Sequence, residues 1–300
     1  MDFNGKTALI TGGVSGIGFG IARAFAAAGI DLVLTYRNAA YRDRAAEWFA
    51  RERRAPPRFV ELDVTDRARW REVADAVGPV HILVNNAGVS VFGPTDSASF
   101  ADYDWIMGVN FGGVVNGLVT FIPRIKARGE GGYIVNVASM AAYLPGPQAG
   151  IYTASKFAVR GLTECLRFNL APHGIGVSLM CPGLTRTNAW DSALRRPAAF
   201  AASGFAPADH AELARFGEAF TAGMEPLEVG EKTLAGMREN RAVIFTHPEF
   251  AEDFDEIHRA CRDALPQEPA PEGRLHIERL RRAAARAAAE GRQISLDDLT

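Results

Sequence analysis

The strongest constraint on the fold of this 300-residue chain is an alternation of short apolar runs with helical patterns. The runs are rich in β-branched residues and end in small or turn-forming residues; they span 7–11, 31–36, 58–62, 82–85, 132–138, 176–181 and 242–245. Strands that alternate with helices form a parallel sheet. Continuous apolar runs such as HILVNN and YIVNVAS are typical of strands that helices cover on both faces. The sequence therefore predicts an α/β fold with a doubly wound, Rossmann-type parallel sheet.

The same alternation divides the chain into one sheet domain and an appended segment. We predict that residues 1–247 form the Rossmann-type domain, with a substrate lid at about 184–225 after the sixth strand. A proline-rich linker at 266–273 precedes an Ala/Arg-rich stretch that is typical of a surface helix. Residues 248–300 are therefore expected to form a C-terminal helical extension.

Composition limits the partners that the protein binds. Lys and Arg total 33 against 35 for Asp and Glu, so the net charge of -2 gives no general attraction to nucleic acid or to an anionic membrane. The three cysteines form neither a disulfide framework nor a metal-spaced cluster, and the N-terminus lacks the pattern of a signal peptide. No apolar run approaches the roughly 20 residues of a membrane span. We expect a cytoplasmic protein that binds a small molecule and no metal, nucleic acid or membrane.

A glycine-rich turn, TGGVSGIG, connects the first strand to the first helix. Its GxxxGxG spacing permits a tight turn and close approach of the backbone to a pyrophosphate. The following helix offers free N–H groups and the positive end of its dipole. Because the turn lies after a strand and before an amphipathic helix, we predict a dinucleotide site there. Its residues are Gly12, Ser15, Gly16, Ile17 and Gly18.

The end of the second strand predicts which dinucleotide binds. An acidic residue about 20 positions beyond the glycine-rich turn would bind the ribose 2′-hydroxyl of NAD, but this chain has Tyr36 and Arg37 there. Asp31 lies at the opposite end of that strand and cannot substitute. The guanidinium of Arg37 can form charge-assisted hydrogen bonds to a 2′-phosphate. NADP(H) is therefore the expected cofactor, and NAD(H) remains the alternative.

Two more segments complete the expected cofactor cleft. Asp63 and Val64 follow the third strand, where the carboxylate can accept a hydrogen bond from the adenine amino group; without a cofactor, Asp63 would simply cap a helix. The segment NNAG ends the fourth strand, where it forms either a polar turn or a backbone wall beside the cofactor. The wall is expected to consist of Asn86, Ala87 and Gly88.

A tyrosine and a lysine on one helix face suit the proton chemistry of carbonyl reduction. That reaction requires a proton donor at the oxygen, and a free phenol keeps its proton up to about pH 10. Tyr152 and Lys156 lie four residues apart, so the ammonium is expected to favour the phenolate. Tyr152 would act as the acid in reduction and as the base in oxidation. Ser139, at the end of the fifth strand, would form a hydrogen bond with the substrate oxygen.

In this order and spacing, the motifs resemble the short-chain dehydrogenases/reductases over most of Lys6 to Thr187. The matching pieces are the glycine-rich turn, NNAG, Ser139, the YxxxK pair and the PG dipeptide. The resemblance implies a nicotinamide-dependent oxidoreductase. Within the family, YDWIMGVNFGGVVNGLVTFIPR, GIGVSLMCPGLTRTN and the tail past FTHPEF are similar to the Cα-dehydrogenases of lignin-type β-aryl ethers. Those relatives act on benzylic alcohols, usually with NAD.

The resemblance also implies roles that spacing alone does not assign. Asn110 matches the family's active-site asparagine and would anchor a water that relays protons, and Lys156 would hold the nicotinamide ribose. The family segment that contacts the nicotinamide carboxamide corresponds to Pro182, Gly183, Thr185 and Thr187, with Thr185 in place of a more usual apolar residue. Long helices around 105–126 and 152–171 commonly pair between subunits in the family, so a homodimer or homotetramer is expected.

Bulky side chains follow the sixth strand and lie in the neighbouring loops. They suggest a lid over a bulky apolar, aromatic substrate, although core packing would give the same pattern for many of them. Arg186, Arg195 and Arg196 leave a substrate carboxylate open. The candidate pocket residues are Ser90, Phe92, Met140, Tyr143, Leu144, Gln148, Leu184, Trp190, Phe200, Phe205 and Phe216.

The sequence thus favours an oxidoreductase that interconverts a ketone and a secondary alcohol, and two alternatives stay open. One is an NAD-dependent Cα-dehydrogenase of benzylic alcohols. The other is a non-catalytic dinucleotide-sensing protein of the same fold. A sensor is expected to lose its catalytic groups, whereas this chain keeps all four: Asn110, Ser139, Tyr152 and Lys156.

Overall fold

The computed structural model describes residues 1–207, 210–290 and 292. A seven-stranded sheet forms the centre of the molecule, in the order β3-β2-β1-β4-β5-β6-β7, and all neighbouring strands are parallel. This confirms the predicted doubly wound sheet, and the strand ends agree with the prediction to within one residue. The strands are β1 (Thr7–Ile10), β2 (Asp31–Tyr36), β3 (Arg58–Glu61), β4 (Ile82–Asn85), β5 (Gly132–Val137), β6 (Ile175–Cys181) and β7 (Val243–Phe245).

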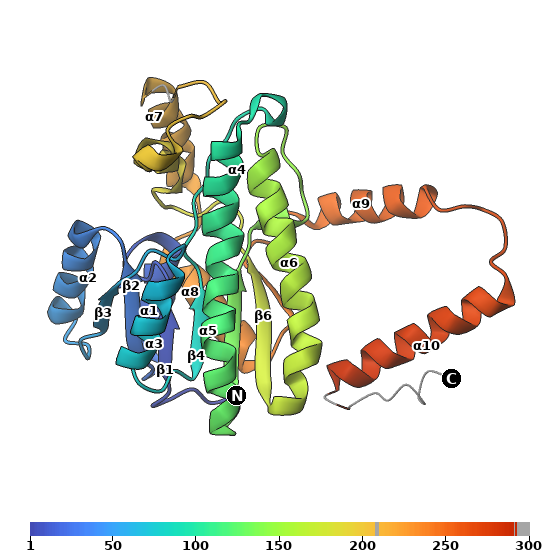
Figure 1. The fold of residues 1–300 in the computed structure, drawn as a ribbon, viewed down its shortest axis with the longest axis horizontal. Helices are drawn as coiled ribbons and strands as arrows, with labels where there is room; N and C mark the ends of the chain where they lie inside the picture. Colours follow the sequence, from blue (N-terminus) through green and yellow to red (C-terminus); the bar gives the residue numbers. More distant parts are fainter. Residues whose placement is uncertain (208–209, 291, 293–300) are drawn as a thin grey trace.

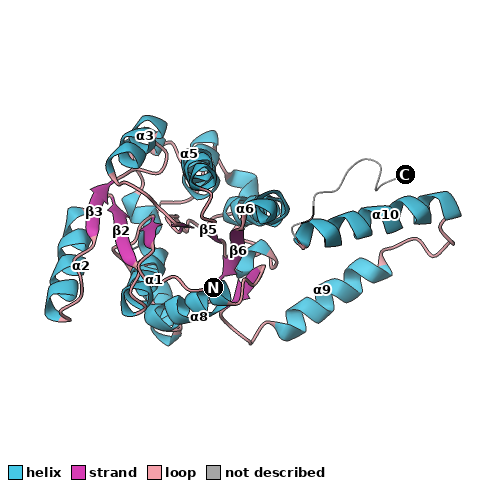
Figure 2. Ribbon diagram, turned by 90° about the horizontal axis from the view of Figure 1, so that it is seen from below, coloured by secondary structure: helices cyan, strands magenta, loops and turns pink. Residues whose placement is uncertain are grey.

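Helices cover both faces of the sheet, as the continuous apolar strands require (Figure 2). One face carries α1 (Gly16–Ala27), α2 (Ala39–Arg51) and α8 (Pro226–Arg238). The other carries α3 (Arg67–Ala76), α5 (Gly113–Arg128) and α6 (Gly150–Leu170). Two separate apolar clusters fill the space between the sheet and these layers. The fold is therefore a single three-layer domain to which C-terminal helices are added.

One long apolar helical segment belongs to the core. Helix α4 (Phe100–Met107) continues through a π-helical turn, Gly108–Gly112, into α5, which gives 29 residues that could cross a membrane by length and composition alone. However, 56% of an apolar 18-residue stretch of this helix is buried inside the protein. Trp105 and Phe121 are among the buried side chains that pack against the sheet. This packing accounts for the apolar character of the helix.

The chain beyond β7 leaves the sheet as an open arm (Figures 1 and 2). The arm consists of α9 (Ala251–Asp263) and α10 (Glu272–Ala289), and neither helix has a fully buried residue. Phe254 packs its partly buried ring against the core, and α10 returns to lie against α6. The connection between the two helices spans 264–271, so it begins and ends two residues earlier than the predicted proline-rich linker at 266–273.

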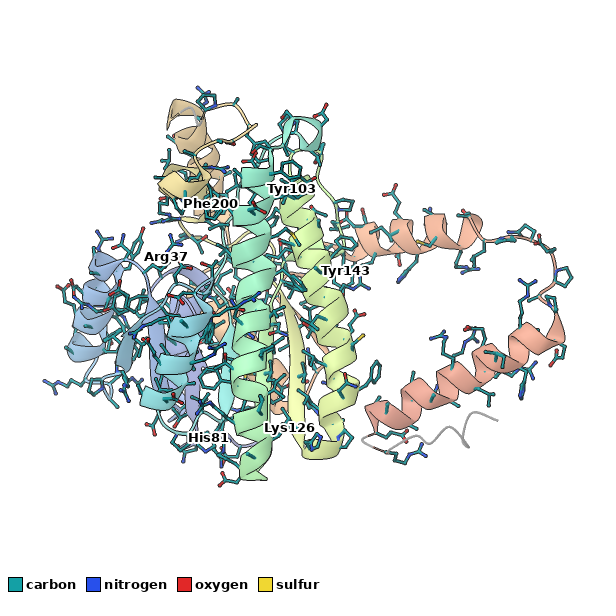
Figure 3. All side chains as sticks on the ribbon, in the orientation of Figure 1. Arg37, His81, Tyr103, Lys126, Tyr143 and Phe200 are labelled. Carbon is teal, nitrogen blue, oxygen red and sulfur yellow. The ribbon has the colours of Figure 1, made fainter. Side chains whose placement is uncertain are left out.

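The direction of the strands places the chemistry at one edge of the sheet. Figure 3 shows Arg37, which follows β2, at the upper end of the strands, and His81, which precedes β4, at the lower end. The predicted dinucleotide and catalytic motifs follow the carboxyl ends of β1 to β6. Ligands of open parallel sheets bind outside these ends, so the motifs converge on one site.

The lid prediction falls partly outside the described residues. Between β6 and α8 the chain forms short turns, among them Ala189–Arg195 and Ala198–Phe200, and then α7 (His210–Ala219). In Figure 1 this region lies above the carboxyl edge of the sheet. Residues 208 and 209 and the side chain of Phe216 lie outside the described part of the chain.

Candidate active site

The glycine-rich turn lies between β1 and α1 and opens toward a cleft. Gly12 and Gly16 have φ angles of 61° and 51°, in the left-handed region that favours glycine. Gly18 packs so closely that a Cβ there would lie 2.4 Å from Nδ2 of Asn86. Ser15 precedes α1 but its side chain caps no N–H of that helix. The first-turn N–H groups of α1 and the glycine cradle therefore fit the pyrophosphate of a dinucleotide.

The NNAG segment is bonded directly to this turn. Oγ1 of Thr11 accepts hydrogen bonds from the backbone N–H groups of Asn86 (2.8 Å) and Ala87 (2.9 Å). Nδ2 of Asn86 donates in return to the carbonyl of Thr11 at 2.8 Å. The two motifs thus form one rigid backbone wall, in which Asn86, Ala87 and Gly88 face the cleft.

Tyr36 and Arg37 lie at the cleft, and Asp63 lies beside them. Nη1 of Arg37 is 3.2 Å from Oδ2 of Asp63, and both side chains are 43% exposed. The other carboxylate oxygen of Asp63 accepts hydrogen bonds from N and Oγ1 of Thr65. Asp31 is paired with Thr7 at the start of β2, at the far edge of the sheet, as expected. The sequence did not predict that Asp63 would bind Arg37.

Tyr152 and Lys156 lie one turn apart on α6, at the centre of the cleft. Lys156 is 5% exposed, and its Nζ donates to the carbonyl of Val137 at 3.2 Å. The same Nζ lies 5.5 Å from the centre of the Tyr152 ring. A Cβ on Gly88 would lie 3.7 Å from this Nζ, so the ammonium faces the NNAG wall. One positive charge therefore stands beside both the phenol ring and the expected cofactor path.

Asn110 lies in the π-helical turn and is 1% exposed. Its Oδ1 accepts from the N–H of Val89 at 2.8 Å, and its Nδ2 donates to the carbonyl of Val89 at 3.0 Å and to Oγ of Ser155 at 3.1 Å. The side chain thus ties the loop after NNAG to α6. Asn110 is not among the residues that line the cleft, and its expected anchoring of a water stays a prediction.

Ser139 stands two residues beyond β5, and its Oγ accepts a hydrogen bond from the N–H of Ala141 at 3.1 Å. This bond orients the hydroxyl at the start of a short turn while leaving its proton for another acceptor. Cys181, at the end of neighbouring β6, is buried, and burial raises the pKa of its thiol to about 12. The thiol is therefore neutral and is no candidate nucleophile.

The cleft is continuous from α2 to α6 and has a volume of about 1530 Å³. It brings together most of the predicted cofactor, catalytic and pocket residues. Those that line it are Gly12, Ser15, Gly16, Ile17, Tyr36, Arg37, Val64, Asn86, Ala87, Gly88, Ser90, Phe92, Ser139, Met140, Leu144, Tyr152, Lys156, Pro182, Gly183, Leu184, Thr185 and Thr187. Gly18 and Asp63 are not among its lining residues; Gly18 packs against Asn86, and Asp63 binds the lining residue Arg37.

Several predicted pocket residues have other partners among the residues that the structure describes. The Tyr143 ring packs against Phe254 with ring centres 5.2 Å apart and lies under the guanidinium of Arg160 at 3.8 Å, and burial raises the pKa of Tyr143 to about 12. Figure 3 shows Tyr143 on the side of α6 that faces the C-terminal arm. Its expected place in the pocket is therefore corrected to the junction with that arm.

Trp190, Gln148 and two phenylalanines need the same correction. Trp190 covers Gly217, where a Cβ would lie 2.7 Å from its ring. Gln148 contributes a backbone carbonyl that accepts from Gly93 at 2.7 Å. The rings of Phe205 and Phe200 pack on the core, Phe205 directly over Gly93. Trp190, Phe200 and Phe205 thus pack within the protein and do not line the cleft, whereas the lid itself stays a prediction.

Other residues line the cleft that the sequence did not single out. Tyr41, Arg44 and Trp48 of α2 border its nucleotide end. Phe250, which lies beyond the predicted domain boundary at residue 247, borders the substrate end. The short apolar strand just before it was the only available signal, because carboxyl ends of parallel strands share one edge.

Comparison with known proteins supports this geometry. Residues 6–197 match the short chain dehydrogenases. The C alpha-dehydrogenase of Sphingobium sp. strain SYK-6 is 36% identical over 289 residues, which cover 93% of each chain.

Solved structures agree as well. A short chain dehydrogenase/reductase from Burkholderia phymatum, in complex with NAD, has a TM-score of 0.80 at 33% identity and covers 90% of this chain and 99% of its own. A short-chain dehydrogenase from Sphingobium yanoikuyae, in complex with NADPH, has a TM-score of 0.67 at 26% identity over 89% and 98% of the two chains. The protein therefore belongs to the short-chain dehydrogenase/reductase family and is an oxidoreductase whose family uses NAD(P)(H).

Proposed function

We propose that this enzyme interconverts a ketone and a secondary alcohol on a bulky apolar, aromatic substrate, with NADP(H) as the preferred cofactor. The observation that carries the proposal is the apolar rim around Tyr152. The Phe92 ring lies 5.9 Å from the Tyr152 ring, centre to centre, and the same end of the cleft is bordered by Leu144, Leu184 and Phe250. An aryl group beside the reacting carbon would bury its faces against these side chains.

Tyr152 is assigned the proton transfer. Its hydroxyl would protonate the substrate oxygen in reduction and take the proton back in oxidation. The buried ammonium of Lys156 stands near the ring and would favour the negative charge that develops on the phenol oxygen during proton transfer. Lys156 donates one N–H to the carbonyl of Val137, and its other two N–H groups would be available for the ribose of the cofactor. A bound nicotinamide would supply or accept the hydride.

Ser139 and Asn110 are assigned supporting roles. The hydroxyl of Ser139, oriented by the N–H of Ala141, would donate to the substrate oxygen and hold the carbonyl in line with Tyr152. Asn110 fixes Val89 and Ser155 on opposite sides of the site. The helix that carries Tyr152 and Lys156 is thereby held against the NNAG wall.

The arginines of the lid favour an uncharged substrate. Arg196 binds the buried carboxylate of Asp102 at 2.7 Å, Arg195 binds Asp191 at 2.5 Å, and Arg186 is paired with Glu225. Each cation that the sequence left open for a substrate carboxylate thus already has an acidic partner. A carboxylate in the cleft would have to replace one of them.

The NADP preference rests on Arg37. Its guanidinium lies at the cleft edge beyond β2, where no carboxylate occupies position 36 or 37. A 2′-phosphate there would accept charge-assisted hydrogen bonds from Arg37. The second candidate is an NAD-dependent Cα-dehydrogenase of benzylic alcohols, which the C alpha-dehydrogenase of Sphingobium favours by its 36% identity.

We also propose that the enzyme is a cytoplasmic homo-oligomer. Cys165 and Cys261 are exposed free thiols, which a reducing compartment preserves. Val119 on α5 and Phe157 and Phe168 on α6 expose apolar side chains on the helices that were expected to pair between subunits. Light scattering of the purified protein tests the oligomer: a monomeric mass would contradict it.

A matrix of substrates and cofactors tests the proposed reaction. Aryl ketones and diketones are assayed with NADPH and NADH, and their alcohols with NADP+ and NAD+. Linear aliphatic ketones and keto acids serve as controls. The proposal expects the highest kcat/KM for a bulky aryl ketone with NADPH. Highest activity on keto acids would reject the apolar substrate, and highest activity on benzylic alcohols with NAD would favour the second candidate.

A further inference from the structure

The register of the last two strands brings a histidine opposite the PG dipeptide. Cys181 of β6 is paired with Phe245 of β7, so Gly183 and His247, each two residues further on, leave the sheet side by side. His247 is 7% exposed. It lies next to a segment that borders the cleft, because Pro182, Gly183 and Leu184 all line it.

Both ring nitrogens of His247 bind this segment. Nδ1 accepts a hydrogen bond from the backbone N–H of Gly183 at 3.0 Å. Since Nδ1 is the acceptor, the proton resides on Nε2, which donates to the carbonyl of Leu184 at 2.9 Å. Oγ1 of Thr246 lies 2.7 Å from Nδ1 and donates to it as well. The imidazole therefore binds two peptide units, Pro182–Gly183 and Leu184–Thr185, with one acceptor and one donor.

Close packing also restricts the position of Gly183. A Cβ on Gly183 would lie 2.8 Å from Cγ of His247 and 2.8 Å from the ring of Phe250. The backbone of Gly183 thus rests directly on two aromatic rings. The carbonyl of Leu184 also accepts from the N–H of Met224 at 2.9 Å, which fixes the chain on its other side.

We infer that His247 is a positioning residue for the nicotinamide half of the cofactor, acting through Gly183 and Leu184. The inference rests on the proposed function insofar as the segment from Pro182 to Thr187 contacts the nicotinamide. By fixing these peptide units, His247 sets the position of the backbone groups of Gly183 and Leu184 that would border the nicotinamide ring of the bound cofactor. A shift of the segment would move the ring relative to the substrate carbon without disturbing the glycine-rich turn.

The test compares binding of the whole dinucleotide with binding of a fragment that lacks nicotinamide. Titration calorimetry measures NADPH against 2′-phospho-ADP-ribose, and NADH against ADP-ribose, for the wild-type protein and three variants. His247→Phe keeps the ring and removes both hydrogen bonds. His247→Asn keeps an acceptor near the position of Nδ1, and His247→Gln keeps a donor that can reach the carbonyl of Leu184.

We expect His247→Phe to weaken binding of the dinucleotide about tenfold relative to binding of its fragment. The reason is that both neutral hydrogen bonds between His247 and the segment are lost. The Asn and Gln variants should each recover part of this loss. An unchanged ratio in His247→Phe overturns the inference. If that variant does not fold, wild-type ratios in both the Asn and the Gln variants overturn it.

A matched control separates positioning from general stability. His81 also accepts a backbone N–H at Nδ1, from Thr7 at 3.0 Å, but at the opposite edge of the sheet (Figure 3). His81→Phe should leave the ratio of the two affinities unchanged, and a fall equal to that of His247→Phe overturns the inference. If the wild-type protein binds neither the two dinucleotides nor their fragments, the dinucleotide site and the proposed function are both rejected. Binding with an unchanged ratio rejects only the role of His247.

Discussion

The two ends of the cleft are built in different ways. At the nucleotide end, backbone shape determines the site: left-handed glycines, an uncapped helix terminus, and the bonds of Thr11 to the NNAG segment. At the substrate end, long-range side-chain contacts hold the lid, above all the buried pair of Asp102 and Arg196. The nucleotide end is thus defined by short backbone motifs that suit one cofactor. The substrate end is defined by side chains, which can be exchanged to suit a different substrate.

Asp102 is the centre of the lid's attachment to α4. Its side chain is fully buried and accepts hydrogen bonds from Oγ of Ser203 at 2.7 Å and from the backbone N–H of Gly204 at 2.9 Å. N and Oγ of Ser99 also donate to it, and Arg196, whose guanidinium lies 4.7 Å above the ring of Trp105, neutralises it. One carboxylate therefore binds three separate points of the chain.

The largest effect is expected at the point where the two ends meet. Tyr152→Phe removes the proton donor while it keeps the ring that packs against Phe92. We expect turnover to fall at least about a hundredfold, since general acid–base catalysis typically contributes 10² to 10⁴. Dinucleotide affinity, measured by titration, should stay within a factor of about two. Turnover close to that of the wild type would exclude Tyr152 as the acid.

Asp102→Asn tests whether the substrate end depends on one buried pair. The amide can still accept from Ser99 and Gly204, but it leaves Arg196 without a counter-charge. Breaking such a pair costs about 3–5 kcal/mol in the free energy of unfolding. Asp104→Asn, an exposed acid on the same helix, is the control and should change stability by less than about 0.5 kcal/mol. Urea unfolding measures both, and equal effects would reject the central role of Asp102.

The same variant should also separate the two ends in kinetics. A lid that is released from α4 raises KM for the carbonyl substrate, while the glycine-rich turn and its dinucleotide affinity are unaffected. If Asp102→Asn weakened dinucleotide binding as strongly as substrate binding, the two ends would not be independent. Initial rates at saturating cofactor distinguish these results.

Acid should remove part of the lid's contribution to stability. Burial raises the pKa of Asp102, but hydrogen bonds from Ser203, Ser99 and Gly204 outweigh burial and lower the pKa well below its usual 3.8. The unfolded chain therefore takes up this proton first as pH falls, so the stabilisation is complete above about pH 4 and is lost below it. The stability gap between wild-type protein and Asp102→Asn should narrow from pH 7 to pH 3. A constant gap would contradict the shift.

The predictable part of the molecule is the part that local pattern encodes. All seven strands were predicted because each apolar run is a local signal, and the nucleotide turn because its glycines lie within one connection. The C-terminal arm agreed in its helices but not in the linker boundary, which shifted by a few residues at Glu272. Patterns over ten residues thus define elements and their order.

The unpredicted part depends on partners far apart in the chain. Tyr143 faces Phe254, and His247 binds Gly183, which is 64 residues away. A single sequence gives no signal for such pairs. The type of an aromatic residue near an active site does not show whether its ring faces the ligand or the core. Trp190 and Phe205 were therefore wrongly predicted to line the pocket. Residue type predicts burial, but only packing decides direction.

The smallest predicted effect concerns the nucleotide end, where Arg37 should decide between two cofactors. A charge-assisted hydrogen bond contributes about 1.5–3 kcal/mol, so Arg37→Ala should weaken NADPH about tenfold or more and leave NADH nearly unchanged. The loss of Arg37 also removes the cationic partner of Asp63, whose uncompensated negative charge would repel a 2′-phosphate further. Arg124→Ala breaks another exposed pair, between Arg124 of α5 and Asp75 of α3; it is the control and should change neither affinity.

Tyr36→Asp sharpens the same test from the opposite direction. It adds the carboxylate that β2 lacks at its end, which would accept a hydrogen bond from a ribose 2′-hydroxyl and repel a phosphate there. The preference should therefore reverse toward NADH, and Tyr36→Asn, which adds no charge, should produce a smaller change. Titration of all variants with both reduced cofactors decides the matter. If wild-type protein binds NADH more tightly than NADPH, the cofactor assignment of Arg37 is wrong, and its guanidinium serves only as the partner of Asp63.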